Sequence, residues 1–164
     1  MAVTSFQEWM KTVPEEFTKD PLWTVEAYRL GLFAVDLSWH DVTALVRDAR
    51  TRSLSDQLYR AVGSIAANIS EGYSRGTGKD RARFYEYALG SARESRGWYY
   101  AGRHVLSEEI GRHRLGLLTQ IIRLLLKMIP QQRSYTLHED RQTYLSMSEE
   151  PLIEEELLIH VPLQ

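Results

Sequence analysis

The sequence predicts an all-α protein whose four helices pack as an antiparallel bundle. Apolar residues recur at the 3.6-residue period of an α-helix in four segments, over residues 24–49, 53–75, 79–106 and 110–129. The first segment spaces them by alternating steps of four and three, which is typical of bundle helices. We therefore divide the 164 residues into an N-terminal arm (1–23), a helical bundle (24–130) and an acidic C-terminal tail (131–164).

The first bundle helix is expected to begin after a Thr24 cap. Its predicted core seam consists of Tyr28, Leu32, Val35, Trp39, Val42, Val46 and Ala49. The arm before it has Phe6, Trp9, Met10, Val13 and Phe17 at helical spacing. The arm either packs on its own domain or serves as a docking helix, and the sequence leaves both open.

The second helix, from a Ser53 cap to Arg75, has two adjacent stripes. The apolar stripe is Leu54, Leu58, Val62, Ile65 and Ile69. Beside it runs a polar line of Gln57, Arg60, Ala61, Ser64, Asn68, Glu71 and Arg75. Buried polar groups cost roughly 1–3 kcal/mol each when unpaired, so the line predicts a matching partner surface. Ser91 and Glu94 of the third helix are candidate partners, as Asn68 with Ser91 and Arg60 with Glu94.

The third and fourth helices show further seams. In the third, the predicted seam is Phe84, Ala88, Ser91, Ser95, Trp98, Gly102 and Val105, with a second face at Tyr85, Ala92 and Tyr99. The fourth has two parallel seams, one from Leu117 and one from Leu118, and is expected to stop at Pro130. Because one seam suffices for a bundle, the other should face another protomer, the tail or the arm. One hypothesis places Leu152, Ile153, Leu157 and Leu158 of the tail there; the other leaves the tail in solvent.

Composition narrows the function classes. The chain has no cysteine, no signal-peptide pattern and no apolar run long enough to span a membrane, so we expect a cytoplasmic protein. The net charge of −2 is uneven: residues 25–130 hold 16 Lys and Arg against 11 Asp and Glu, whereas residues 131–164 hold 2 against 7. A basic body of this kind favours a polyanionic partner.

Catalytic and metal-binding motifs are not found. The Gly78-Lys79 pair lacks the glycine and the Ser or Thr that a phosphate-binding loop requires, and no Glu-x-x-His pair suits a di-iron site. The histidines lack zinc spacing, and there is no nucleophile elbow. We expect no enzyme activity, no cofactor and no metal.

A two-part pattern links the second and third helices to a known family. It comprises Gln57, Arg60, Ala61, Ser64, Ile65, Asn68, Ile69, Glu71, Gly72 and Arg75, then Phe84, Ala88, Gly90, Ser91 and Glu94. The pattern resembles the signature of the four-helix-bundle proteins often called 23S ribosomal RNA intervening-sequence proteins, a group that includes the accessory variability determinant of diversity-generating retroelements. The resemblance covers roughly residues 25–130, with Ser70 in place of the usual alanine. It implies an up-down-up-down bundle, a barrel-shaped homopentamer and no catalysis, and the retroelement member implies binding to nucleic acid and to a reverse transcriptase.

Two functions remain open from the sequence. One is a non-catalytic oligomeric scaffold that binds RNA or DNA through two basic rims at opposite ends of the second helix. The first rim is Arg47, Arg50 and Arg52, and the second rim is Arg75, Lys79, Arg81 and Arg83. The alternative is a protein-interaction adaptor that uses the arm and tail to engage an operon-encoded partner such as a reverse transcriptase. A weaker reading is a structural pentamer with a small ligand in its channel. The polar line is interpreted as a structural network that fixes helix register or a subunit interface.

Overall fold

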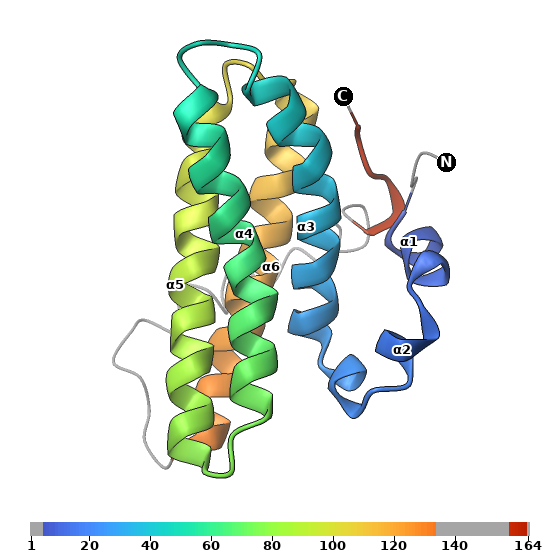
Figure 1. Ribbon diagram of the computed structural model, residues 1–164, viewed down its shortest axis with the longest axis vertical. Coiled ribbons are helices and arrows are strands. Elements are labelled where there is room, and N and C mark those ends of the chain that lie inside the picture. The colour runs from blue at the N-terminus through green and yellow to red at the C-terminus, as the bar shows by residue number, and fades with distance from the viewer. Residues whose placement is uncertain (1–4, 134–157, 164) are drawn as a thin grey trace.

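The computed structural model describes residues 5–133 and 158–163, and this part of the chain is helical with no strand (Figure 1). The α-helices are α1 (Phe6–Thr12), α2 (Glu15–Thr18), α3 (Glu26–Leu45), α4 (Arg52–Tyr73), α5 (Gly78–Gly102) and α6 (Glu108–Gln132), with a 3-10 helix η1 at Pro21–Thr24. The all-helical prediction is confirmed.

The four long helices, α3 to α6, lie side by side and are joined at alternating ends (Figure 1). Neighbours in sequence pack against each other, and α3 also contacts α6. The α3–α4 and α5–α6 connections therefore lie at one end of the molecule, and the α4–α5 connection lies at the other. None of the helices that the structure describes is both long and apolar enough to cross a membrane.

The helix starts differ from the expected caps. Val25, rather than Thr24, precedes α3, and α4 begins at Arg52 with Thr51 as its cap. Thr51 is buried and donates its hydroxyl to the Leu45 carbonyl at 2.6 Å, which closes the turn between α3 and α4. The next two long helices do have side-chain caps: Thr77 accepts from the Asp80 amide at the start of α5, and Ser107 accepts from the Ile110 amide at the start of α6.

The apolar stripe of α4 forms the centre of the core. Leu58, Val62, Ile65 and Ile69 are all fully buried, as the periodicity predicts, and Leu54 is partly buried. A Cβ at Gly31 of α3 would lie 3.3 Å from the Cβ of Ala66, so two small residues set the close approach of α3 to α4 here.

The predicted seam of α3 is wrong. Of its residues only Tyr28 is buried, and Trp39 is 61% exposed. The buried face lies instead at Ala27, Leu30, Gly31, Phe33, Ala34, Leu37, Ser38, Asp41 and Leu45. This helix has two apolar stripes, and the more regular heptad lies on its open side.

The predicted seams of α5 and α6 also need correction. The buried face of α5 is Ala82, Tyr85, Ala88, Leu89, Ala92, Ser95, Tyr99 and Gly102, so the predicted second face is part of the core, while Phe84, Ser91 and Trp98 are only partly buried. In α6 both seams are largely buried within the chain. Pro130 lies in the last turn rather than ending the helix, which continues to Gln132.

The N-terminal arm packs on its own chain. Phe6 and Trp9 are buried, and both rings lie within 5.3 Å of the Phe33 ring centroid. The Trp9 indole also donates to Asp36 at 2.5 Å. In the tail, Leu158 and the buried Val161 pack against the core, whereas Leu152, Ile153 and Leu157 lie outside the described residues.

Candidate nucleic-acid interface

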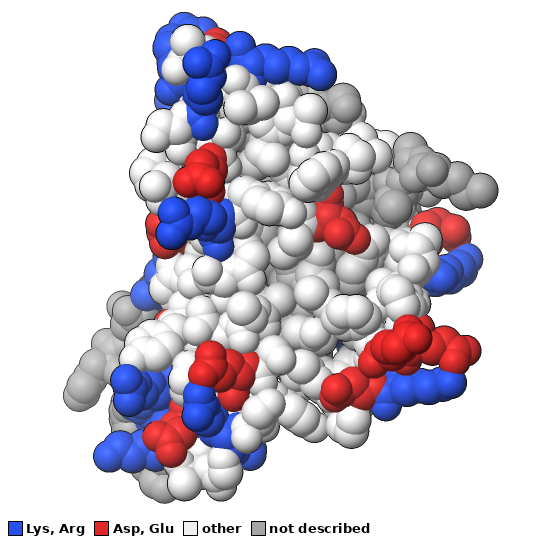
Figure 2. Space-filling view, in the orientation of Figure 1, with Lys and Arg blue, Asp and Glu red and all other residues white. Residues whose placement is uncertain are grey.

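The first rim lies at the end of the molecule where α3 turns into α4. Arg47 and Arg50 belong to the connection, and Arg52 is the first residue of α4. All three side chains are exposed. In Figure 2, Lys and Arg cover this end of the visible face with little acidic surface. A surface of this kind attracts phosphates without reading base sequence.

The carboxylates near the first rim are already paired. Arg50 makes a two-point contact with Asp48, with Nε to Oδ1 at 2.9 Å and Nη2 to Oδ2 at 2.6 Å. Its hydrogen bonds hold the pKa of Asp48 well below the ordinary range. Arg47 and Arg52 have no ion-pair partner among the residues that the structure describes. They are therefore the two arginines of this rim whose charge is least compensated.

Arg103 joins the same end, although the sequence did not single it out. It follows α5, whose last residue, Gly102, lies against the side chains of Leu45 and Leu54. The Arg103 guanidinium stacks 4.0 Å from the Tyr100 ring centroid. The sequence could have indicated the position of Arg103, because in an antiparallel arrangement the third helix ends at the same end of the molecule as the first.

The second rim is more firmly tied into the structure. Arg81 is half-buried and donates to the Gln132 side chain and to the Arg75 carbonyl, both at 3.1 Å. Arg75 pairs with Glu71 and lies over the Phe84 ring, and Arg83 donates to the Tyr87 hydroxyl. Arg81 thus connects the α4–α5 connection to the end of α6. Among the described residues of this rim, Lys79 is the exposed cation that is not tied to a neighbouring group.

The two rims are separate, as expected from the sequence. They lie at opposite ends of α4, which has 22 residues and so spans about 33 Å. One chain therefore presents two distinct basic surfaces rather than one continuous patch.

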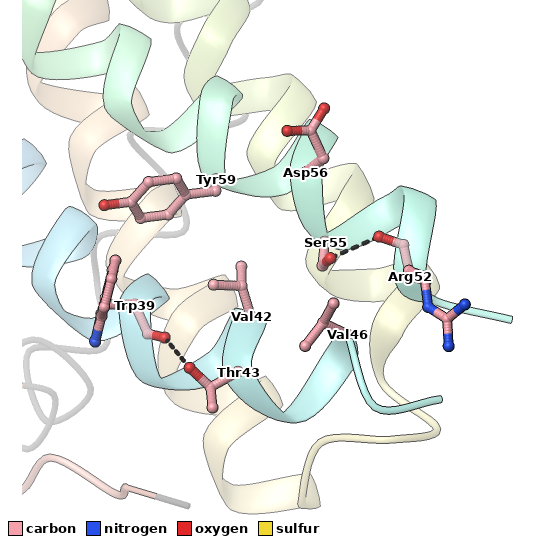
Figure 3. Close-up of a pocket in the computed structure, with 8 residues that line it drawn as sticks. All are labelled: Trp39, Val42, Thr43, Val46, Arg52, Ser55, Asp56 and Tyr59. Carbon is pink, nitrogen blue, oxygen red and sulfur yellow. Dashed lines mark hydrogen bonds between the residues drawn. The ribbon is translucent and has the colours of Figure 1, made fainter. Parts of the chain in front are cut away.

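An aromatic groove opens beside the first rim. It has a volume of about 380 Å³ and lies between α3 and α4, lined by Trp39, Val42, Thr43, Val46, Arg52, Ser55, Asp56 and Tyr59 (Figure 3). The Trp39 and Tyr59 rings meet edge to face with centroids 6.1 Å apart. The sequence placed Trp39 in the core, so this groove was missed.

The polar line of α4 forms no cross-helix network of the expected kind. Asn68 donates to the Ser64 carbonyl of its own helix, and Ser91 donates to the Tyr87 carbonyl of α5. Arg60 approaches Asp56 at 3.7 Å, and Glu94 accepts from the Trp98 indole. The two pairings expected from the sequence are therefore wrong.

Apart from the buried Ala61, the members of the polar line are partly or fully exposed. Gln57, Arg60 and Glu71 are exposed, and Ser64 and Asn68 are half-buried. Near its end the line runs beside α5, because Gly72 lies against Phe84 and a Cβ there would come within 2.9 Å of it. The subunit-interface interpretation of the line thus stays a prediction.

A buried charge cluster, which the sequence analysis missed, ties three of the four long helices together. Asp41 of α3 accepts from Arg114 of α6 through Nε at 2.7 Å and Nη2 at 3.1 Å, and from the Tyr99 hydroxyl of α5 at 2.8 Å. Asp41 and Arg114 are 0% and 1% exposed. Arg114 also donates to the Pro162 carbonyl at 3.0 Å, which fixes the end of the tail.

Nothing in the cluster has the arrangement of a catalytic centre. The Asp41 carboxylate is sealed from solvent and neutralised by Arg114, so it offers no accessible base or nucleophile. Within the described ranges, 5–133 and 158–163, no three His, Asp or Glu side chains come together as metal ligands.

Comparison with known proteins gives one family. The family model described as 23S rRNA-intervening sequence protein matches residues 32–129, which is more than half of the chain. A crystal structure of a protein of unknown function from the S23 ribosomal protein family of Bacteroides thetaiotaomicron is similar, with a TM-score of 0.59 and 23% identity. The match covers 63% of this chain and 97% of that one, and at this identity it supports the fold alone. No curated protein matches.

Proposed function

Because the chain belongs to the 23S rRNA-intervening sequence protein family, we propose that it is a non-catalytic, oligomeric scaffold that binds nucleic acid through its first rim. The observation that carries the proposal is the convergence of Arg47, Arg50 and Arg52 at one end of the molecule, with Arg103 beside them. Phosphates would take the place of the carboxylates that Arg47 and Arg52 lack among the described residues.

The scaffold is a four-helix up-down-up-down bundle that assembles as a homopentamer, as the family resemblance implies. Support for a subunit contact comes from the α4–α5 surface, where the polar line is half exposed. Elsewhere on these two helices, a Cβ at Gly63 of α4 or at Gly90 or Gly97 of α5 would meet nothing within 4 Å. Glycine inside an exposed helix costs up to about 1 kcal/mol relative to alanine, so a closely approaching neighbour would explain its use. Native mass spectrometry would give five copies of the 19.0 kDa chain; a monomer would refute the assembly.

Nucleic-acid binding is tested by titrating the full-length protein with labelled structured RNA, duplex DNA and single strands at low and physiological salt. The Arg47→Ala/Arg52→Ala variant should weaken binding and reduce the slope of log K against log salt by about 2, one unit for each lost phosphate contact. A Lys11→Ala/Lys19→Ala variant removes the same charge from α1 and from the residue that follows α2. It should bind normally, since these lysines are exposed and pair locally with glutamates.

Two results would contradict the first rim. One is equal loss of binding in the rim and control variants, which would show only a net-charge effect. The other is unchanged binding in the rim variant together with loss in Lys79→Ala/Arg83→Ala, which would move the site to the second rim. If the wild type binds no nucleic acid at either salt, the scaffold proposal fails.

The adaptor alternative gains less from the structure. It needs an arm that can engage a partner, but Phe6 and Trp9 are buried against α3. Phe17, 44% exposed in α2, is the large apolar side chain of the described arm that remains available. A protein partner such as a reverse transcriptase would therefore have to bind mainly through the acidic tail.

A further inference from the structure

The aromatic groove beside the first rim is an apolar surface that the fold does not fill. Trp39 is 61% exposed, Val46 43% and Tyr59 37%. Their helices are already held in place by the opposite faces, where Leu37, Leu45 and Leu58 are buried. Trp39 therefore contributes little to the core, and its exposure suggests that something binds it.

The groove joins aromatic rings to a positive end of the molecule. Arg52 is part of its lining, and Arg47 follows Val46 directly. In Figure 3, Trp39 and Tyr59 stand at one end of the groove, Val42 and Val46 form its floor, and Arg52 lies at the other end. Asp56, the one carboxylate in the lining, lies 3.7 Å from Arg60. The lining thus offers flat apolar faces next to cations.

This combination suits unpaired nucleotides better than a duplex. Single-strand binding sites stack bases on aromatic side chains while arginines and lysines follow the phosphates. In a duplex the bases are already stacked on each other, so a duplex could contact only the arginines of the rim. A protein partner would fill the apolar floor but would not need the adjoining rim of three arginines.

We propose that the aromatic groove binds single-stranded nucleic acid, with bases stacked on Trp39 and Tyr59 and phosphates held by Arg47, Arg50 and Arg52. This inference rests on the proposed function and specifies its ligand: unpaired bases enter the groove. The site should prefer single strands over a duplex of the same sequence, and it should discriminate little between bases, because every base has a face that can stack.

The test compares binding of labelled 12-nucleotide oligo-U and oligo-dT, and of a matched duplex, to full-length wild type and three variants. Trp39→Ala should weaken single-strand binding by about 5- to 150-fold, the range that loss of one stacked base gives, with little effect on the duplex. Trp39→Phe keeps an aromatic face and should stay within a few-fold of wild type. Phe17→Ala removes another exposed aromatic side chain, far from the rim, and should change nothing.

Salt dependence separates stacking from charge. Trp39→Ala should shift log K without changing its slope against log salt, whereas Arg47→Ala/Arg52→Ala should lower the slope. If Trp39→Ala binds single strands like wild type while the arginine variant loses binding, the groove proposal is overturned and the first rim stands. If no variant, wild type included, binds nucleic acid, both proposals fail.

A contact between copies of the chain is the competing occupant. It predicts that Trp39→Ala lowers the native mass, with loss of nucleic-acid binding only as a consequence of dissociation. A changed mass for Trp39→Ala and Trp39→Leu alike would therefore overturn the proposal. An unchanged mass, with Trp39→Leu as defective in binding as Trp39→Ala, would support base stacking over simple apolar burial.

Discussion

Replacing Asp41 with alanine should destabilise the fold by about 3–5 kcal/mol, the range found when one partner of a buried ion pair is removed. The structure gives the reason. Arg114 is 1% exposed and would retain its positive charge with no carboxylate beside it. The Tyr99 hydroxyl would lose its acceptor as well. The remaining contacts of Arg114, with the Pro162 carbonyl and the His113 ring, cannot neutralise a charge.

The chain supplies its own control in Asp56→Ala. Asp56 also faces an arginine, but this pair is 3.7 Å apart and the side chains of Asp56 and Arg60 are 67% and 73% exposed. An exposed i,i+4 pair contributes about 0.3–0.5 kcal/mol, so the control should change stability roughly tenfold less. Both variants are compared by urea unfolding at one protein concentration, because the stability of an oligomer depends on concentration.

A second variant separates the charge from the packing. In Asp41→Leu/Arg114→Met both charges are gone and apolar atoms fill much of the volume, so the loss should be smaller than in Asp41→Ala alone. Equal losses in Asp41→Ala and Asp56→Ala would refute the reasoning, since burial would then make no difference. A double variant worse than the single one would show that the hydrogen bonds, rather than the unpaired charge, dominate.

Three further predictions test the fold. In Gly78→Ala the new Cβ would lie 2.5 Å from the carbonyl oxygen of the last α6 residue, so unfolding should become easier by about 1–3 kcal/mol, while Gly76→Ala, with open space around it, should change stability by less than about 0.5 kcal/mol. Burial, with help from the neighbouring carboxylate, raises the pKa of Tyr99 well above 10. The unfolded chain then loses this proton first, so stability present below pH 10 should fall as the pH rises above it, and Tyr99→Phe should flatten that fall in urea unfolding between about pH 9 and 11. Deleting residues 158–164 exposes the site of the buried Val161 and should lower the free energy of unfolding by about 1–3 kcal/mol; an unchanged urea midpoint would contradict the packing of the tail.

Helix positions could be predicted from the sequence because they depend on local patterns. The expected segments 24–49, 53–75, 79–106 and 110–129 differ from α3, α4, α5 and α6 by at most four residues at any end. The core of α4 was also predicted correctly, since its stripe of Leu58, Val62, Ile65 and Ile69 is both apolar and regular. Pro130 misled the last boundary because proline in the final turn of a helix need not end it at once.

The buried side of α3 could not be read in the same way. Its core stripe contains Ser38 and Asp41, which look like surface residues until their partners are known. Asp41 is paired with Arg114, 73 residues later, and periodicity has no information on such distant pairs. The competing stripe through Val35, Trp39 and Val42 is more uniformly apolar and was therefore taken for the core.

The same error explains where the candidate site lies. An apolar stripe indicates that a helix face has a partner, but it does not say whether the partner is the rest of the chain, another copy or a ligand. In α4 the partner of the stripe is the core. In α3 the stripe through Trp39 is left over once Asp41 and Leu37 face inward, and it comes to lie beside Arg47 and Arg52. A seam that is regular in sequence yet exposed in the fold thus points more directly to the candidate binding surface than the charge of the arginines alone.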